Sequence, residues 1–228
     1  MTSRTRWLVA STAAAVAVYA LMWVGYVSQW TWLTGMDSLA LDRAHDYGVA
    51  HPGWVTGWDV FCTVLGPNAF RLVGLVVVVV ALWRRHFRVA VFVLIAEGLS
   101  GPLVELSKYL ADRPRPITAL VFAQSSSFPS GHAVGVMVGV LVLLTVAWPV
   151  LHPPRRGWLV ALGALLVIAI GVGRVVLNVH HPSDVIAGWA LGYAYFVVCL
   201  LLVPPRRRIT AIADTPEALG TARGRWRR

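Results

Sequence analysis

The sequence is poor in charged residues. Charged side chains make up 13% of the 228 residues and hydrophobic side chains 57%, whereas an average soluble protein carries about 25% charge. A soluble core of this size could not bury so much apolar surface, but a lipid bilayer can surround it. Several apolar runs also approach the ~20 residues that an α-helix needs to cross a membrane. The composition therefore predicts one integral-membrane domain and no separate soluble domain.

Cysteine and lysine are also scarce. Cys62 and Cys199 fall near opposite membrane faces in the arrangement below, so they cannot form a disulfide with each other, and no metal-ligand spacing surrounds them. The net charge of +10 comes from 19 arginines and one lysine, Lys108, against 10 acidic residues. The arginines cluster between apolar runs and lack an aromatic-basic pattern. This pattern is typical of topology-setting charge and argues against nucleic acid as a partner.

Six apolar runs are predicted as transmembrane helices, at about 7–27, 68–83, 89–110, 132–148, 158–179 and 184–203. The first run is too long for the apolar part of a signal peptide, so we interpret it as a retained span. The segment 28–67 combines Asp and Trp residues and predicts one or two helices in the outer interface; a seventh span at 54–66 is the alternative. The predicted fold is an all-α six-transmembrane-helix bundle with interfacial helices on the outer side.

Basic residues divide unequally between the two sides of this bundle. Fourteen of the 20 flank the spans on the side that carries both termini, and the positive-inside rule makes that side cytoplasmic. We predict a multi-pass protein of a bacterial plasma membrane, with a membrane domain at 1–208 and a basic cytoplasmic tail at 209–228. The other six basic residues lie on or near the outer side: Arg43, Arg71, Lys108, Arg113, Arg115 and Arg174.

Three polar segments interrupt the apolar chain, at 108–116, 125–132 and 173–184. The predicted topology brings all three to the outer face, although it was derived without them. They offer three cations and a helix start, which suit a phosphoryl group with developing negative charge. They also offer one imidazole that a carboxylate can orient for attack and a second that can protonate the leaving oxygen. The candidate site residues are Lys108, Arg115, Ser130, Gly131, His132, Arg174, His180 and Asp184.

These residues resemble the motifs of the type-2 phosphatidic acid phosphatase superfamily, the lipid phosphate phosphatases. The first motif is Lys, six residues, Arg-Pro, and Lys108 with 115–116 matches it. The second, Pro-Ser-Gly-His, matches 129–132. The third is Ser-Arg, five residues, His, three residues, Asp; 174–184 matches at both spacings, but Gly173 stands where the family has Ser. The resemblance covers about 108–184 and the six-span layout.

The resemblance implies a metal-independent lipid phosphatase that needs no cofactor and takes its substrate from the bilayer. His180 would be the nucleophile that forms a phosphohistidine, Asp184 its orienting partner, and His132 the general acid. The phosphoryl oxygens would be bound by Lys108, Arg115, Ser130, Gly131 and Arg174.

Several alternatives stay open at this point. The lipid is a polyprenyl diphosphate, phosphatidic acid or phosphatidylglycerol phosphate, and the oligomeric state is unknown. A lipid phosphotransferase would use the same site, whereas a lipid-phosphate transporter is a weaker alternative because it would not need the histidine–aspartate pair. Arg113 either assists phosphate binding or anchors its loop, and Glu97, in mid-span, either partners a buried polar group or contacts substrate. His181 is interpreted as interfacial.

Overall fold

The computed structural model describes residues 2–205, and every regular element within this range is an α-helix. The predicted tail at 209–228 lies outside the described residues. The helices of the described range are α1 (Ser3–Val27), α2 (Thr31–Ala50), α3 (Pro52–Val64), α4 (Pro67–Trp83), α5 (Phe87–Gly98), α6 (Ser100–Ala111), α7 (Gly131–Ala147), α8 (Pro153–Val176) and α9 (Pro182–Leu202).

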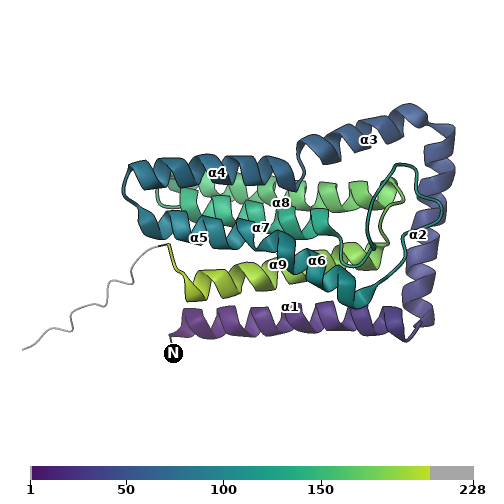
Figure 1. Ribbon diagram of the computed structural model, residues 1–228, viewed down its shortest axis with the longest axis horizontal. Coiled ribbons are helices and arrows are strands. Elements are labelled where there is room, and N and C mark those ends of the chain that lie inside the picture. Colours follow the sequence, from purple (N-terminus) through teal and green to yellow (C-terminus); the bar gives the residue numbers. More distant parts are fainter. Residues whose placement is uncertain (1, 206–228) are drawn as a thin grey trace, which may run out of the picture.

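The long helices run side by side along the length of the molecule, and α2 crosses one end of them (Figure 1). Helix α7 is central, since it packs against α4, α5, α6, α8 and α9. Its valines Val134, Val138 and Val142 are fully buried in one cluster with Phe196 and Val197 of α9. The outer helices bury little of their surface, as expected for helices whose backbone polar groups are satisfied internally and whose side chains face lipid.

Five stretches of the described residues are long and apolar enough to cross a membrane, and a sixth apolar helix, Gly131–Ala147, is shorter. The five are Ser3–Val27, Pro52–Trp83, Phe87–Ala111, Pro153–Val176 and Pro182–Leu202. Each contains or nearly coincides with one of the predicted spans. The predicted all-α six-helix membrane fold is confirmed.

The segment 28–67 forms two helices with different positions. Helix α2 lies across the end of the bundle, whereas α3 runs beside α8 and leads into α4 (Figure 1). Trp58 and Phe61 of α3 pack against the buried cluster that contains Val167 and Ile170 of α8. Because only Leu65 and Gly66 separate α3 from α4, the two helices form one bent apolar stretch, and the second predicted span begins earlier than residue 68.

The third predicted span is broken at Leu99 into α5 and α6. Pro102 follows the break, and a proline has no backbone N–H to continue the hydrogen-bond ladder. The hydroxyl of Ser100 donates to the carbonyl of Glu97 at 2.7 Å, next to the break. Helix α6 follows the break, and its last turn carries Lys108.

The two ends of the bundle differ in chemistry. The start of α1, the turn between α4 and α5 and the end of α9 lie at one end, and α2 with the segments around 112–130 and 177–181 lies at the other (Figure 1). The arginines at 4–6 and 84–88 therefore share the first end. The polar segments predicted to carry the chemistry share the second end.

Candidate active site

Backbone hydrogen bonds hold the three polar segments together at the α2 end of the bundle. The amide of Leu120 donates to the carbonyl of Leu177 at 3.1 Å, and the amide of Ser130 donates to the carbonyl of Asp184 at 3.0 Å. The first bond joins the loop 112–130 to the end of α8. The second joins the start of α7 to the first turn of α9, so residues more than 50 positions apart in the sequence become neighbours.

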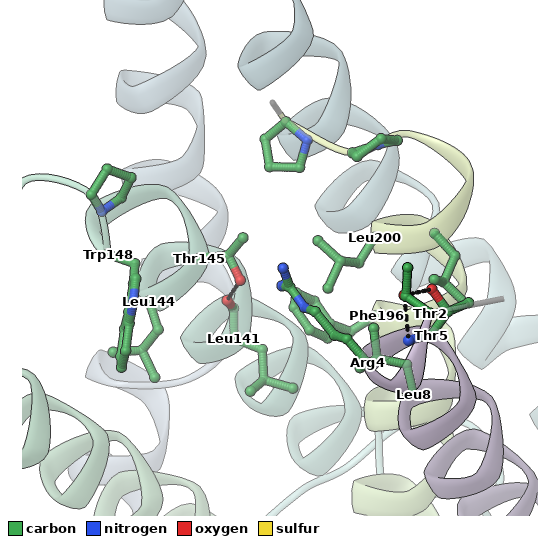
Figure 2. Close-up of a pocket in the computed structure, with 14 residues that line it drawn as sticks. Thr2, Arg4, Thr5, Leu8, Leu141, Leu144, Thr145, Trp148, Phe196 and Leu200 are labelled. Carbon is green, nitrogen blue, oxygen red and sulfur yellow. Dashed lines mark hydrogen bonds between the residues drawn. The ribbon is translucent and has the colours of Figure 1, made fainter. Parts of the chain in front are cut away.

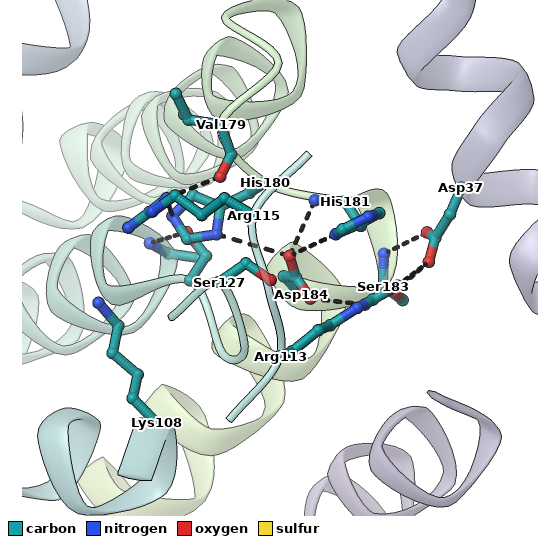
Figure 3. A network of polar contacts seen from close by, with 12 residues as sticks. Asp37, Lys108, Arg113, Arg115, Ser127, Val179, His180, His181, Ser183 and Asp184 are labelled. Carbon is teal, nitrogen blue, oxygen red and sulfur yellow. Dashed lines mark hydrogen bonds and ion pairs between the residues drawn. The ribbon is translucent and has the colours of Figure 1, made fainter. Parts of the chain in front are cut away.

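His180 lies at the centre of the polar groups, with only 2% of its surface exposed. Its Nε2 lies 3.2 Å from Nη1 of Arg115 (Figure 3). A guanidinium only donates hydrogen bonds, so Nε2 is the acceptor and the ring proton belongs on Nδ1. The unprotonated nitrogen thus faces the cations, and the N–H faces Asp184.

Asp184 has no exposed surface and contacts both neighbouring histidines. Its Oδ2 accepts hydrogen bonds from the amide of His181 at 2.8 Å and from Nδ1 of His181 at 3.1 Å. This is the capping role expected from Pro182 at the first helical position and Asp184 at the third. The same oxygen lies 3.6 Å from Nδ1 of His180, which is longer than a hydrogen bond and leaves that nitrogen without a partner among the described residues. Catalytic hydrogen bonds often shorten only when substrate binds.

Burial lowers the pKa of His180 from 6.5 to about 4. The positive charges of Arg115 and Arg174 act in the same direction, and Asp184 opposes them. A protonated imidazole would be poorly solvated in this position. His180 is therefore neutral at pH 7, which is the form of histidine that can act as a nucleophile.

Arg115 and Arg174 act electrostatically on this histidine, and Lys108 is a third cation of the same cluster. Arg115 is fixed by carbonyls, since its Nη2 donates to Gln124 at 2.7 Å and its Nη1 donates to Val179 at 2.7 Å. Lys108 is buried and points toward the His180 cluster from α6 (Figure 3). Its Nζ donates to the hydroxyl of Ser125 at 2.7 Å. Arg174 is 7% exposed, and its Nε finds no hydrogen-bond partner within residues 2–205. A buried donor without a partner is costly, and an oxyanion would satisfy it.

The start of α7 completes the cluster. Ser130 caps the helix, because its hydroxyl accepts a hydrogen bond from the amide of Ala133 at 3.5 Å. Gly131 and His132 line a cavity of about 520 Å³ together with Lys108. Four groups act electrostatically on His132, namely Arg174, His180, Lys108 and Arg115. All eight candidate residues predicted from the sequence thus lie at one end of the bundle.

A larger cavity, of about 870 Å³, lies at the opposite end, between α1, α7 and α9 (Figure 2). Most of the residues that line it are apolar, such as Leu8, Leu144 and Phe196. Arg4 is the charged residue in the lining. It contains none of the predicted site residues. Within residues 2–205 no group of three or more His, Cys, Asp or Glu side chains is placed to hold a metal ion.

Comparison with known proteins gives the family. The family model of the PAP2 superfamily matches residues 87–208, more than half of the chain. This chain belongs to the PAP2 superfamily. The prediction made from the three motifs is confirmed.

The similar proteins include an undecaprenyl-diphosphatase of Sulfolobus acidocaldarius, 33% identical over 118 residues, which cover 49% of this chain and 53% of that protein. Phosphatidylglycerophosphatase B of Bacillus subtilis is 31% identical over 148 residues, which cover 63% of this chain and 72% of that protein. The crystal structure of a transmembrane PAP2-type phosphatidylglycerolphosphate phosphatase from Bacillus subtilis superposes with a TM-score of 0.72 at 18% identity, over 87% of this chain and 98% of that one. The chain thus matches about half the length of the first relative, and the structural likeness is one of fold.

The departure of this PAP2 chain at Gly173 has a steric reason. A Cβ at this position would lie 2.5 Å from Sγ of Cys62 and 2.7 Å from the ring of Trp58. Helix α3 therefore approaches α8 so closely that a serine would displace one of these side chains. Cys62 and Cys199 are both free and buried, as predicted from their separation.

Arg113 lies in a buried polar network. The sequence predicted a role for Arg113 but not for its partner Asp37. Nη1 of Arg113 donates to Oδ1 of Asp184 at 2.6 Å, and its Nη2 donates to Oδ2 of Asp37, on α2, at 2.8 Å (Figure 3). Asp37 also accepts from the amide and the hydroxyl of Ser183, at 3.0 and 2.6 Å. The guanidinium lies 4.6 Å from the ring centroid of Tyr26, on α1. Arg113 therefore anchors its loop to three helices, which is one of its two predicted roles.

Asp37 was missed as a site residue, although the sequence carries a signal for it. Leu33, Asp37 and Leu41 are four residues apart and all buried, so they form one face of α2. A carboxylate in the middle of an apolar helical face requires a buried partner. The sequence does not say which of the outer cations supplies it.

Proposed function

We propose that this PAP2 protein is a lipid phosphatase that removes a phosphate from a lipid phosphomonoester or diphosphate through a phosphohistidine intermediate. The observation that carries the proposal is the environment of His180. Its Nε2 accepts from Arg115 and its Nδ1 faces Asp184. The imidazole is held neutral by burial, and its Nε2 lone pair points to a cation that a phosphoryl group would also bind. Once Arg115 donates to the phosphoryl oxygens instead, that lone pair is available for attack on phosphorus.

In the proposed first step, Nε2 of His180 bonds to phosphorus and the imidazole becomes positively charged. Asp184 stabilises that charge, because it is already buried and lies on the Nδ1 side. Negative charge on the phosphoryl oxygens is offset by cations and by amides at the start of α7, which perform the role that a metal ion has in other phosphatases. The residues in this role are Lys108, Arg115, Ser130, Gly131 and Arg174.

His132 is the proposed general acid. It lines the cavity next to Lys108 and lies near His180. It would donate a proton to the leaving oxygen of the lipid, and the resulting neutral imidazole would accept a proton from the water that hydrolyses the phosphohistidine.

Lipid phosphates are the proposed substrates because the site lies at the end of a bundle of apolar helices. The two sequence relatives bear the names of an undecaprenyl-diphosphatase and a phosphatidylglycerophosphatase, which supports this class. A bilayer would present such a lipid with its tail embedded and its head group at the level of the loops 112–130 and 177–181.

The proposed orientation places this end of the bundle outside the cell. Helix α1 starts, and α9 ends, at the opposite end, near the arginines at 4–6 and 84–88. The positive-inside rule assigns that end to the cytoplasm. We propose a plasma-membrane domain at 1–208 with both termini cytoplasmic and a basic tail at 209–228.

The test is phosphate release by the purified protein in detergent, measured on a panel of lipid phosphates and diphosphates in excess EDTA. We expect inorganic phosphate as the product and no loss of activity with EDTA. Loss of activity that Mg²⁺ restores would refute the metal-free mechanism. Transfer of phosphate to an acceptor other than water would identify a phosphotransferase, and binding without turnover would indicate a transporter.

A further inference from the structure

The cavity beside His132 extends well beyond the eight candidate residues. Besides Lys108, Gly131 and His132, it is lined by residues of the α3–α4 junction and of α6, including Asn68, Arg71 and Glu105. His180 does not line it. A phosphoryl group held between the two histidines would therefore turn its leaving side toward this cavity, because attack and departure occur in line on opposite faces of phosphorus.

Arg71 supplies a second positive charge to the cavity. Its Nη1 donates to Oδ1 of Asn68 at 3.2 Å, and its Nη2 lies 3.2 Å from the position that a Cβ would take at Gly101 of α6. The guanidinium thus reaches from α4 across to α6. An arginine that only anchored α4 in the lipid interface would extend along its own helix toward water.

The charge balance of the residues that line the cavity favours an anion; Glu97, a further carboxylate that interacts with Arg71, lies outside this lining. Lys108 is 10% exposed at its side chain, whereas Glu105, 3.9 Å from it, is 68% exposed. Water therefore screens the carboxylate more than the buried ammonium. The amino terminus of α4 faces the same cavity at Pro67, and its cap residue, Gly66, offers no side-chain hydrogen bond. Both features add positive potential near Arg71.

We propose that Arg71 and Asn68 bind the second phosphate of a lipid diphosphate, so that the preferred substrates are lipid diphosphates rather than lipid phosphomonoesters. This inference rests on the proposed function and adds the substrate class. The terminal phosphate is the one attacked by His180. The phosphate next to the lipid then lies in the cavity, with its oxygens toward Arg71.

The step balances with this assignment. A bond forms between Nε2 of His180 and the terminal phosphorus, and the bond from that phosphorus to the bridging oxygen breaks. The electron pair stays on the bridging oxygen, which becomes part of the departing lipid monophosphate and receives a proton from His132. Arg71 offsets the negative charge of this leaving group. A lipid monoester has an alcohol in the same position and gains nothing from Arg71.

The experiment compares farnesyl diphosphate with farnesyl monophosphate, which share one lipid tail. Arg71→Gln is expected to lower kcat/KM for the diphosphate about 5–10-fold relative to the monophosphate, because Arg71 is exposed and water screens part of its charge. Asn68→Ala is expected to lower the ratio of the two kcat/KM values in the same direction but by less. It provides the test if Arg71→Gln folds poorly. Arg43→Gln, at an exposed arginine of α2 that does not line the cavity, is the matched control and should leave the ratio unchanged.

Equal losses on both substrates in both cavity variants would overturn the inference and leave the proposed function intact, because the wild type would still release phosphate. A wild type that prefers the monophosphate would overturn it as well. A wild type that hydrolyses neither substrate, nor any other lipid phosphate, would overturn the proposed function itself.

Discussion

Arg113 is the residue whose replacement tests the tertiary arrangement of the site most directly. It is 5% exposed and bridges two carboxylates, Asp37 and Asp184, which are 2% and 0% exposed. Arg113→Ala removes the cation and leaves both carboxylates buried without it. Breaking a buried ion pair in this way costs about 3–5 kcal/mol. For a chain of this length the apparent unfolding midpoint should fall by roughly 6–20 °C.

The catalytic effect of Arg113→Ala should be on kcat. Arg113 contacts Asp184, which faces His180, but it does not line the cavity of about 520 Å³. A small displacement of the nucleophile lowers the rate by on the order of 10²-fold, whereas substrate binding should change little. The assays are thermal unfolding in detergent and initial rates on one lipid phosphate.

Two further variants control this experiment. Arg43→Ala removes an exposed arginine of the same helix that carries Asp37, and it should change neither quantity. The double variant Arg113→Ala with Asp37→Asn should be less destabilised than the sum of the single variants, by about 0.5–3 kcal/mol. An unchanged unfolding midpoint in Arg113→Ala would refute the buried bridge. A raised KM with unchanged kcat would instead assign Arg113 to phosphate binding, the other role left open by the sequence.

Three further predictions concern the histidines and the topology. His180→Ala should abolish turnover and any acid-labile phosphoenzyme, while His132→Ala should be slower by ~10²–10⁴ and partly rescued by a good leaving group such as p-nitrophenolate; equal responses of the two variants would refute the assigned roles. Because burial lowers the pKa of His180 to about 4, the neutral, attacking form persists as the pH falls, and the acidic limb of kcat/KM should lie near pH 4. An acidic limb near pH 6.5 that remains in the slow His132→Ala variant would contradict this. In a cysteine-free background, Ser126→Cys should react with a membrane-impermeant maleimide in intact cells and Arg156→Cys should not; the reverse pattern would place the site in the cytoplasm.

Much of this protein is predictable from its sequence because the physical causes are local. The low content of charge and the six apolar runs predict the helical membrane fold, since a helix in lipid must satisfy its own backbone. The capping role of Asp184 follows from its position two residues after Pro182. The motif spacings from Lys108 to Asp184 identify the family, and the uneven division of arginines predicts the orientation that the maleimide experiment tests.

Tertiary structure decides what depends on distant partners. Glu97 is an example of what the sequence does not determine. The sequence places it in the middle of a span, whereas the packed helices show that it lies against Gly74 of α4 and outside the cavity of the site. The pairing of Arg113 with Asp37 joins residues 76 positions apart, and Arg71 of α4 approaches Gly101 on a different helix, α6. Hydrophobic periodicity identifies which face of a helix is buried, but it does not identify the side chain on another helix that meets it. That choice is made by the packing of whole helices, whose relative positions no local pattern encodes.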